Sequence, residues 1–263
     1  MQYKIMDAHV HIYPDKIADK AVDAISKYYG ITMQGSGTIS DLLEKGTKAG
    51  ISRYLVHSTA TKPEQVKPIN DFISLLISQY DCFTGFGTLH PDMENIEEEI
   101  DRMISMGIKG IKMHPEFQEF YLDEDRMIPL YKAVEGRLPL LVHMGDKNKN
   151  SSSPARLAKI IDQFPKLQVI AAHLGGYSMW DESLEFLAGK NLYMDTSSSL
   201  MILDSTTAEK IIRTHGIDKI VFGSDYPMWS FEEEIDRFLK LKLTETERKM
   251  IFWDNINNLL SSV

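Results

Sequence analysis

The sequence contains one cysteine, no apolar run near the ~20 residues that cross a membrane, and fewer basic than acidic residues. Cys82 has no partner for an internal disulfide, which favours a reducing compartment. The opening segment MQYKIMDAHVHIYP reaches His and Asp too early for a signal peptide. We therefore expect a cytoplasmic protein without a membrane partner.

Positive charge is also scarce, because 29 Lys and Arg face 38 Asp and Glu and give a net charge of −9. Nucleic-acid binding depends on neutralising phosphates, so no nucleic-acid partner is expected and a small-molecule substrate is favoured. Hydrophobic residues make up 43% of the chain and charged residues 25%, as in globular proteins. No linker or low-complexity tract divides the chain, which predicts one domain over residues 1–263.

Short apolar runs rich in β-branched residues recur along the chain and predict eight strands. After the first, they begin about 25–30 residues apart, which suits strand–helix–strand units rather than hairpins. The predicted strands are 4–11, 53–58, 82–89, 108–114, 138–144, 167–173, 191–197 and 218–225.

Helix signals lie between these runs. Ser40 is a predicted N-cap, Ser153 precedes a proline suited to a first helical position, and Thr244 with Glu247 forms a capping-box pattern. An additional helix is predicted over 18–29. Eight strands alternating with helices predict an α/β fold, a (β/α)8 barrel of the TIM type. A doubly wound open sheet is the alternative, but it normally carries a glycine-rich turn after its first strand, where this chain has histidines.

Histidines collect where the predicted strands end. Only His215 lies elsewhere, late in a predicted helix; the strand-end residues are His9, His11, His57, His90, His114, His143 and His173, joined by Asp225. Barrel enzymes build their sites at these ends. His9 and His11 are two residues apart in a strand, so both side chains face the same way and can share one ion.

His143 and Asp225 can complete such a metal site from the fifth and eighth strands. Imidazole with carboxylate suits Zn²⁺ first, and also Fe²⁺, Mn²⁺ or Co²⁺. We therefore predict one divalent metal, with a position left open for a water molecule that the ion activates.

Five motifs follow one another in the order found in a known group of enzymes: Asp7-Ala8-His9-Val10-His11, Gly110-Ile111-Lys112-Met113-His114-Pro115, Leu141-Val142-His143-Met144-Gly145, Ala172-His173-Leu174-Gly175-Gly176 and Phe222-Gly223-Ser224-Asp225-Tyr226-Pro227. Together they resemble the amidohydrolase superfamily, in its amidohydrolase-related branch that includes aminocarboxymuconate semialdehyde decarboxylase. The resemblance extends over essentially the whole chain.

The resemblance implies that His9, His11, His143 and Asp225 ligate one metal. It also implies that His173 polarises the water or the substrate and that Asp225 takes the proton from water, which makes these two the catalytic pair. Because relatives are often dimers, it further implies a homodimer. In binuclear relatives a carboxylated lysine bridges two metals; Lys112 is the candidate here, although the local pattern resembles the mononuclear branch.

Four further residues are predicted to contact the substrate: His57, His114, Tyr226 and Trp229. For each, packing within the barrel is the alternative role. The polar loop 145–153 is a candidate lid, in which Lys147 or Lys149 attracts an acidic substrate, or else a solvated surface loop.

Three functions are open to this site. The first is a metal-dependent hydrolase acting on a small amide, lactone or ester. The motifs do not separate it from the second function, but the short chain favours it. The alternative is a non-oxidative decarboxylase, a lyase acting on an aromatic or muconate-type acid at the same metal. A barrel that binds its metal without turnover is the third.

Overall fold

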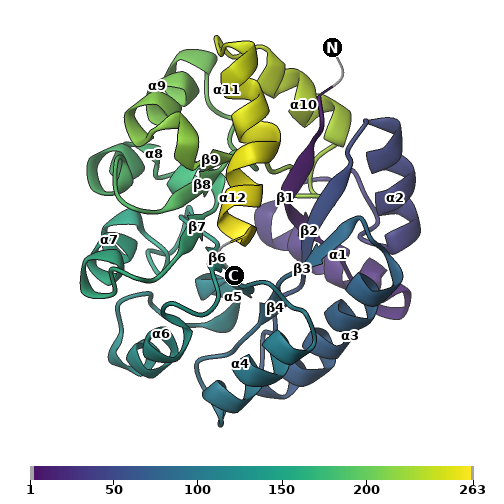
Figure 1. Ribbon diagram of the computed structural model, residues 1–263, viewed down its shortest axis with the longest axis vertical. Helices are drawn as coiled ribbons and strands as arrows, with labels where there is room; N and C mark the ends of the chain where they lie inside the picture. The colour runs from purple at the N-terminus through teal and green to yellow at the C-terminus, as the bar shows by residue number, and fades with distance from the viewer. Residues whose placement is uncertain (1–2, 262–263) are drawn as a thin grey trace.

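In the part of the chain that the computed structural model describes, residues 3–261, the apolar runs form short parallel strands around a common axis (Figure 1). They are β1 (Met6–His11), β2 (Arg53–His57), β3 (Phe83–Gly85), β4 (Gly87–Thr88), β5 (Ile111–Met113), β6 (Leu140–Val142), β7 (Val169–Ala171), β8 (Tyr193–Asp195) and β9 (Ile220–Val221). Neighbours pair in the orders β1-β2-β3 and β4-β5-β6-β7-β8-β9, always parallel.

The third predicted strand is divided at Phe86 into β3, which pairs with β2, and β4, which pairs with β5. Phe86 N still donates to Val56 O (3.0 Å) and Gly87 N to Gly110 O (2.9 Å), so the two sheets remain continuous. On the other side, Ala8 N donates to Phe222 O at 2.8 Å, which joins β1 to the chain after β9. The sheet closes on itself, and the predicted barrel is confirmed.

Helices surround the strands in Figure 1. They are α1 (Asp15–Tyr29), α2 (Ile39–Lys48), α3 (Val66–Gln79), α4 (Ile96–Ser105), α5 (Pro115–Gln118), α6 (Ile128–Val134), α7 (Pro154–Gln163), α8 (Trp180–Glu182), α9 (Ser205–His215), α10 (Phe231–Leu239), α11 (Glu245–Lys249) and α12 (Asn255–Ser261). The predicted capping box of Thr244 is present. The N-cap of α2 is Thr38 rather than Ser40, because the helix begins at Ile39 and the Thr38 side chain accepts from Asp41 N.

Two apolar layers hold the barrel together. The larger lies between the strands and the outer helices. The smaller fills the barrel interior and includes Met6, Leu55 and Leu141 together with Ile256 and Leu259 of α12. Figure 1 shows α12 lying across the strands. Because Met6 begins β1, this helix covers the end opposite the strand C-termini and leaves the histidine-bearing end open. None of the helices described is long and apolar enough to span a membrane.

Candidate active site

The closure of the barrel brings the first motif, with His9 and His11, next to the last motif, with Asp225. Asp225 N donates to His9 O at 3.0 Å, and His11 N donates to Tyr226 O at 2.8 Å. These bonds place the Asp225 carboxylate beside the two histidines of β1. Asp225 and His173 have left-handed backbones, with φ of 63° and 62°. Such backbones are uncommon for residues with a Cβ and concentrate at functional sites.

Three ligand atoms converge at the seam, the place where β1 meets the chain that follows β9. His9 Nε2 and His11 Nε2 are 3.3 Å apart, and Asp225 Oδ1 lies 3.4 Å from the first and 3.3 Å from the second. Atoms that bind one zinc ion tetrahedrally at about 2.1 Å lie about 3.4 Å from each other. The spacing and the imidazole–carboxylate donors therefore fit a single divalent metal.

The orientation of the His9 ring is fixed by partners of Nδ1, the ring nitrogen that points away from the candidate metal centre. Its Nδ1 lies 2.8 Å from Asp195 Oδ2 and 3.1 Å from Ser197 Oγ. Burial, followed by the charge of Lys112, lowers the pKa of His9 to about 3, so the imidazole is neutral at pH 7. With Nδ1 donating to Asp195, the lone pair of Nε2 faces the seam.

Sequence analysis missed Asp195 as a site residue, although the criterion that found the histidines also applies to it. Asp195 ends β8, within the predicted strand 191–197, and is fully buried. A search for carboxylates over the last three residues of each predicted strand, rather than at its final residue, would have found it.

Lys112 is buried beneath the same atoms, with its Nζ 3.0 Å from His9 Nε2. Burial lowers its pKa to about 8, against the attraction of Asp225 and Asp195. The side chain therefore points at the candidate metal centre, as its strand position predicts. A bridging role for it stays a prediction.

His143 and His173 form the outer half of the cluster. His173 Nε2 lies 3.0 Å from His143 Nδ1, and His143 Nε2 lies 2.8 Å from Gly145 O. Both ring nitrogens of His143 thus have protein partners, and none of the candidate metal groups places His143 with His9, His11 or Asp225. His173 is grouped with His9 and Asp225. For His143 to join the metal as predicted, its ring must turn away from one of these partners.

A second candidate group consists of His114, Glu116 and His143. The rings of His114 and His143 are stacked 3.9 Å apart and only 8° from parallel. Their nitrogen lone pairs lie in the ring planes, so two stacked imidazoles do not converge on one ion. This group consequently does not suit a metal.

The pocket beside the cluster has largely apolar walls. Tyr29 of α1, Phe117 and Tyr177 provide aromatic surface. The full lining is His11, Ile25, Tyr29, Met33, His114, Phe117, His143, His173, Tyr177, Ser198, Asp225, Pro227 and Met228. Tyr29 also places its hydroxyl 3.2 Å from His114 Nε2. The predicted site residues His11, His114, His143, His173 and Asp225 therefore surround one pocket.

Tyr226 and Trp229 are not among the residues that line this pocket, so their contact with substrate stays a prediction. Tyr226 stacks on Phe231, and its hydroxyl donates to Asp41 Oδ2 at 2.6 Å, so the ring belongs to the core. Trp229 Nε1 donates to Ser198 Oγ at 2.8 Å, and Ser198 Oγ donates to Asp225. Trp229 thus supports the carboxylate through a serine.

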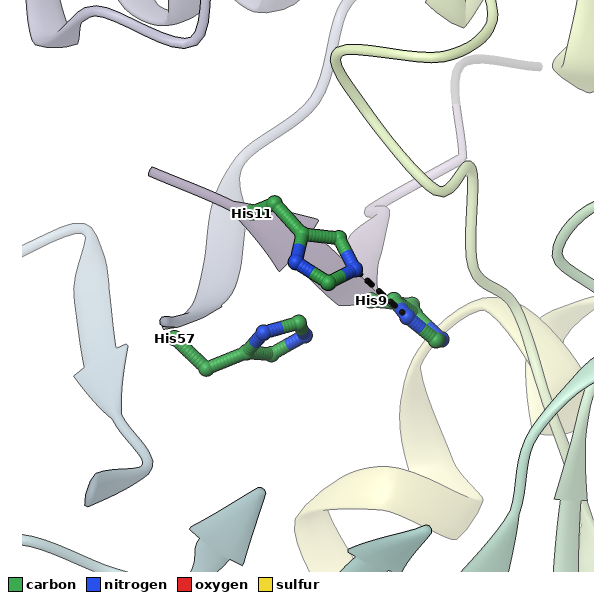
Figure 2. Close-up of side chains that lie close together, drawn as sticks. All are labelled: His9, His11 and His57. Carbon is green, nitrogen blue, oxygen red and sulfur yellow. Dashed lines mark hydrogen bonds between the residues drawn. The ribbon is translucent and has the colours of Figure 1, made fainter. Parts of the chain in front are cut away.

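His57 does not line the pocket either. It lies at the end of β2, buried against His9 and His11 (Figure 2). Its ring is edge-on to that of His11, with centroids 4.4 Å apart. The contacts that the structure gives His57 are therefore with two of the candidate metal ligands, and its contact with substrate stays a prediction.

Among the curated proteins that share sequence with this chain, two are decarboxylases by name. A γ-resorcylate decarboxylase of Polaromonas sp. (strain JS666 / ATCC BAA-500) is 27% identical over 120 residues, covering 38% of this chain and 36% of the relative. A 2-amino-3-carboxymuconate-6-semialdehyde decarboxylase of Caenorhabditis elegans is 24% identical over 231 residues, covering 62% and 58%. The chain thus matches less than two thirds of either relative's length.

Solved structures match over nearly the whole chain. A TIM-barrel protein, Bb4693 from Bordetella bronchiseptica, has a TM-score of 0.82 at 18% identity, covering 98% of this chain and 99% of that one. A dihydroxybenzoic acid decarboxylase from Polaromonas sp. JS666, with bound manganese and the inhibitor 2-nitroresorcinol, has a TM-score of 0.77 at 18% identity, covering 98% and 97%. These likenesses agree with the barrel. The family model described as amidohydrolase matches residues 6–261, and the chain belongs to the amidohydrolase family.

Proposed function

We propose that this amidohydrolase-family protein is a metal-dependent, non-oxidative decarboxylase of a small aromatic or muconate-type carboxylic acid. The two curated relatives described above are named as decarboxylases, of γ-resorcylate and of a carboxymuconate semialdehyde. They favour the lyase over the hydrolase that the short chain favoured. The observation in this chain that supports it best is the pocket, in which Tyr29, Phe117 and Tyr177 offer flat apolar walls beside the histidine–carboxylate cluster.

His9, His11 and Asp225 are the proposed core of the metal centre, with His143 as the further predicted ligand. When bound there, a divalent ion such as Mn²⁺ or Zn²⁺ supplies positive charge that binds and polarises an anionic substrate. The apolar walls orient the planar part of the substrate and exclude water from it.

In the proposed reaction, the bond between a substrate carbon and its carboxylate breaks, CO₂ leaves, and a proton takes its place on that carbon. Asp225 is the proposed proton carrier. Burial by itself would raise the pKa of Asp225, but the nearby His9 and the hydrogen bond with His11 hold it well below its ordinary value. The carboxylate is therefore ionised at neutral pH, so in the proposed step it takes a proton from solvent and passes it to the substrate carbon as CO₂ leaves. His173 is placed beside Asp225 to orient or polarise the substrate.

The test is CO₂ release from 2,6-dihydroxybenzoate by protein loaded with Mn²⁺ or Zn²⁺. We expect Asp225→Asn to lower kcat/KM by about 10²–10⁴-fold, because the variant loses both the charge and the proton carrier. Asp162→Asn is the matched control, since Asp162 is an exposed carboxylate paired with Lys190 and should leave the rate unchanged. Acid release from lactones or esters, without CO₂ release from aromatic or muconate-type acids, would favour the hydrolase instead.

A further inference from the structure

His57 is the one histidine in the described part of the chain whose ring makes no hydrogen bond. Its side chain is fully buried, and both Nδ1 and Nε2 lack a partner. At least one ring nitrogen of every other histidine there donates or accepts a hydrogen bond. Buried polar groups in folded proteins are nearly always paired, and an exception needs an explanation.

The ring of His57 is directed at the candidate metal centre. Figure 2 shows it beside the rings of His9 and His11, which come from the neighbouring strand β1. It meets His11 at an interplanar angle of 82° and His9 at 69°, with centroids 4.4 and 5.0 Å apart. One ligand nitrogen from each of the three histidines lies within 4.8 Å of the other two.

The register of the strands explains why the three rings meet. His11 and His57 are partners in the parallel pairing of β1 with β2, at the last residue of each strand. His9 is two residues earlier in β1, on the same side of the pleat. The edge formed by β1 and β2 therefore presents three imidazoles toward one point.

We propose that His57 is an additional nitrogen ligand of the metal that His9 and His11 hold. The inference rests on the proposed metal centre but not on the proposed reaction. It adds β2 to the strands that supply ligands. Metal binding would also explain why the His57 ring has no hydrogen bond and why it lies edge-on to the ring of His11. His57, His9 and His11 would give the centre three imidazoles beside the Asp225 carboxylate, with His143 as the further predicted ligand. Such a nitrogen-rich set selects a late first-row cation such as Zn²⁺ or Co²⁺ over Mg²⁺ or Ca²⁺.

The first experiment measures Zn²⁺ affinity by competition with a chelator. We expect His57→Gln and His57→Ala to weaken binding about 10–100-fold, the loss typical of disturbing a metal site. His90→Gln is the control, because His90 is also buried and follows a strand but lies outside the candidate metal groups. Circular dichroism of the metal-free variants separates a lost ligand from a lost fold.

The second experiment gives a positive signal even where affinity is hard to measure. In His57→Cys loaded with Co²⁺, a thiolate on the metal produces a sulfur-to-cobalt charge-transfer band in the near ultraviolet. The wild-type protein, which retains Cys82 at the start of the third strand region, controls for the native thiol and should show no such band.

Unchanged affinity in His57→Gln together with no band in His57→Cys would overturn the role of His57 while leaving the metal centre intact. Failure of the wild-type protein to bind Zn²⁺ or Co²⁺ would overturn both. A protein that binds metal through His57 but releases no CO₂ would sustain this inference and contradict only the proposed reaction.

Discussion

Residues that hydrogen-bond to the candidate metal ligands fix the orientation of those ligands. Asp195 is the clearest case, because it is fully buried and serves two neighbours at once. Its Oδ2 lies 2.8 Å from His9 Nδ1, and its Oδ1 accepts from the His173 backbone N–H at 3.0 Å. One carboxylate thus positions a candidate ligand and a candidate catalytic histidine.

We predict that Asp195→Asn weakens metal affinity about 10–100-fold and lowers activity by a similar factor. The amide removes the negative charge that fixes the tautomer of His9, and its NH₂ group opposes the His9 N–H. Metal affinity by chelator competition measures the first effect.

Asp204→Asn is a suitable control, since Asp204 is exposed, lies outside the candidate metal groups and caps α9. Equal metal affinity in Asp195→Asn and the wild-type protein would show that His9 does not depend on this carboxylate.

Among the larger elements, the strands were the most predictable part of the molecule. Their near-continuous apolar runs follow from a parallel sheet covered on both faces, and the end of each run located the histidines. The division of the third strand at Phe86 was not predictable, because it depends on the change of partner from β2 to β5.

The orientation of individual side chains was less predictable than their strand positions. His143 was correctly placed at a strand end, yet its ring bonds His173 and Gly145 rather than joining the close set. Tyr226 follows Asp225 directly but turns into the core. Such directions depend on loop backbones, including the left-handed φ of Asp225, that no periodicity encodes.

The loop after β6 is packed closely against the chain that follows β7, and Gly145 marks the contact. Its φ is +79°, and a Cβ there would lie 2.3 Å from Tyr177 O. We predict that Gly145→Ala lowers the free energy of unfolding by about 3 kcal/mol, combining left-handed strain with a clash against backbone.

Gly136→Ala separates these two effects. Gly136 has a φ of +73°, and a Cβ there would have no atom within 4 Å, so only the backbone cost of about 1 kcal/mol is expected. Urea unfolding of both variants provides the comparison, and equal losses would show that the loop yields to the methyl group.

The pH dependence of the stability of the whole molecule contains a contribution from Glu234 in α10. Burial, opposed by Arg237, raises the pKa of Glu234 from 4.5 to about 7. The folded protein thus holds a proton that the unfolded chain has already lost, and this group's contribution becomes less favourable as pH rises from about 4.5 to 7.

We predict that Glu234→Gln gains stability relative to the wild-type protein over that interval. The difference should be near zero at pH 4.5 and reach about 1–3 kcal/mol above pH 7. Thermal or urea unfolding across the interval measures it.

Glu233→Gln is the matched control, because Glu233 also pairs with Arg237 but is 60% exposed. If the two variants follow the same pH profile, the burial of Glu234 is not the cause.

The seam between β1 and the chain after β9 has a thermodynamic consequence. It joins residues far apart in sequence; Ser224 N, for example, donates to Asp7 Oδ1 across a separation of 217. The proposed metal at His9, His11 and Asp225 would link residues from the two ends of the sequence, and it would bind tightly only when the barrel is closed and brings these residues together. Free metal at 100 times its dissociation constant therefore adds about 2.7 kcal/mol to the stability of the closed barrel, and a chelator withdraws it. The free energy of unfolding of the barrel would then depend on the concentration of free metal around the protein.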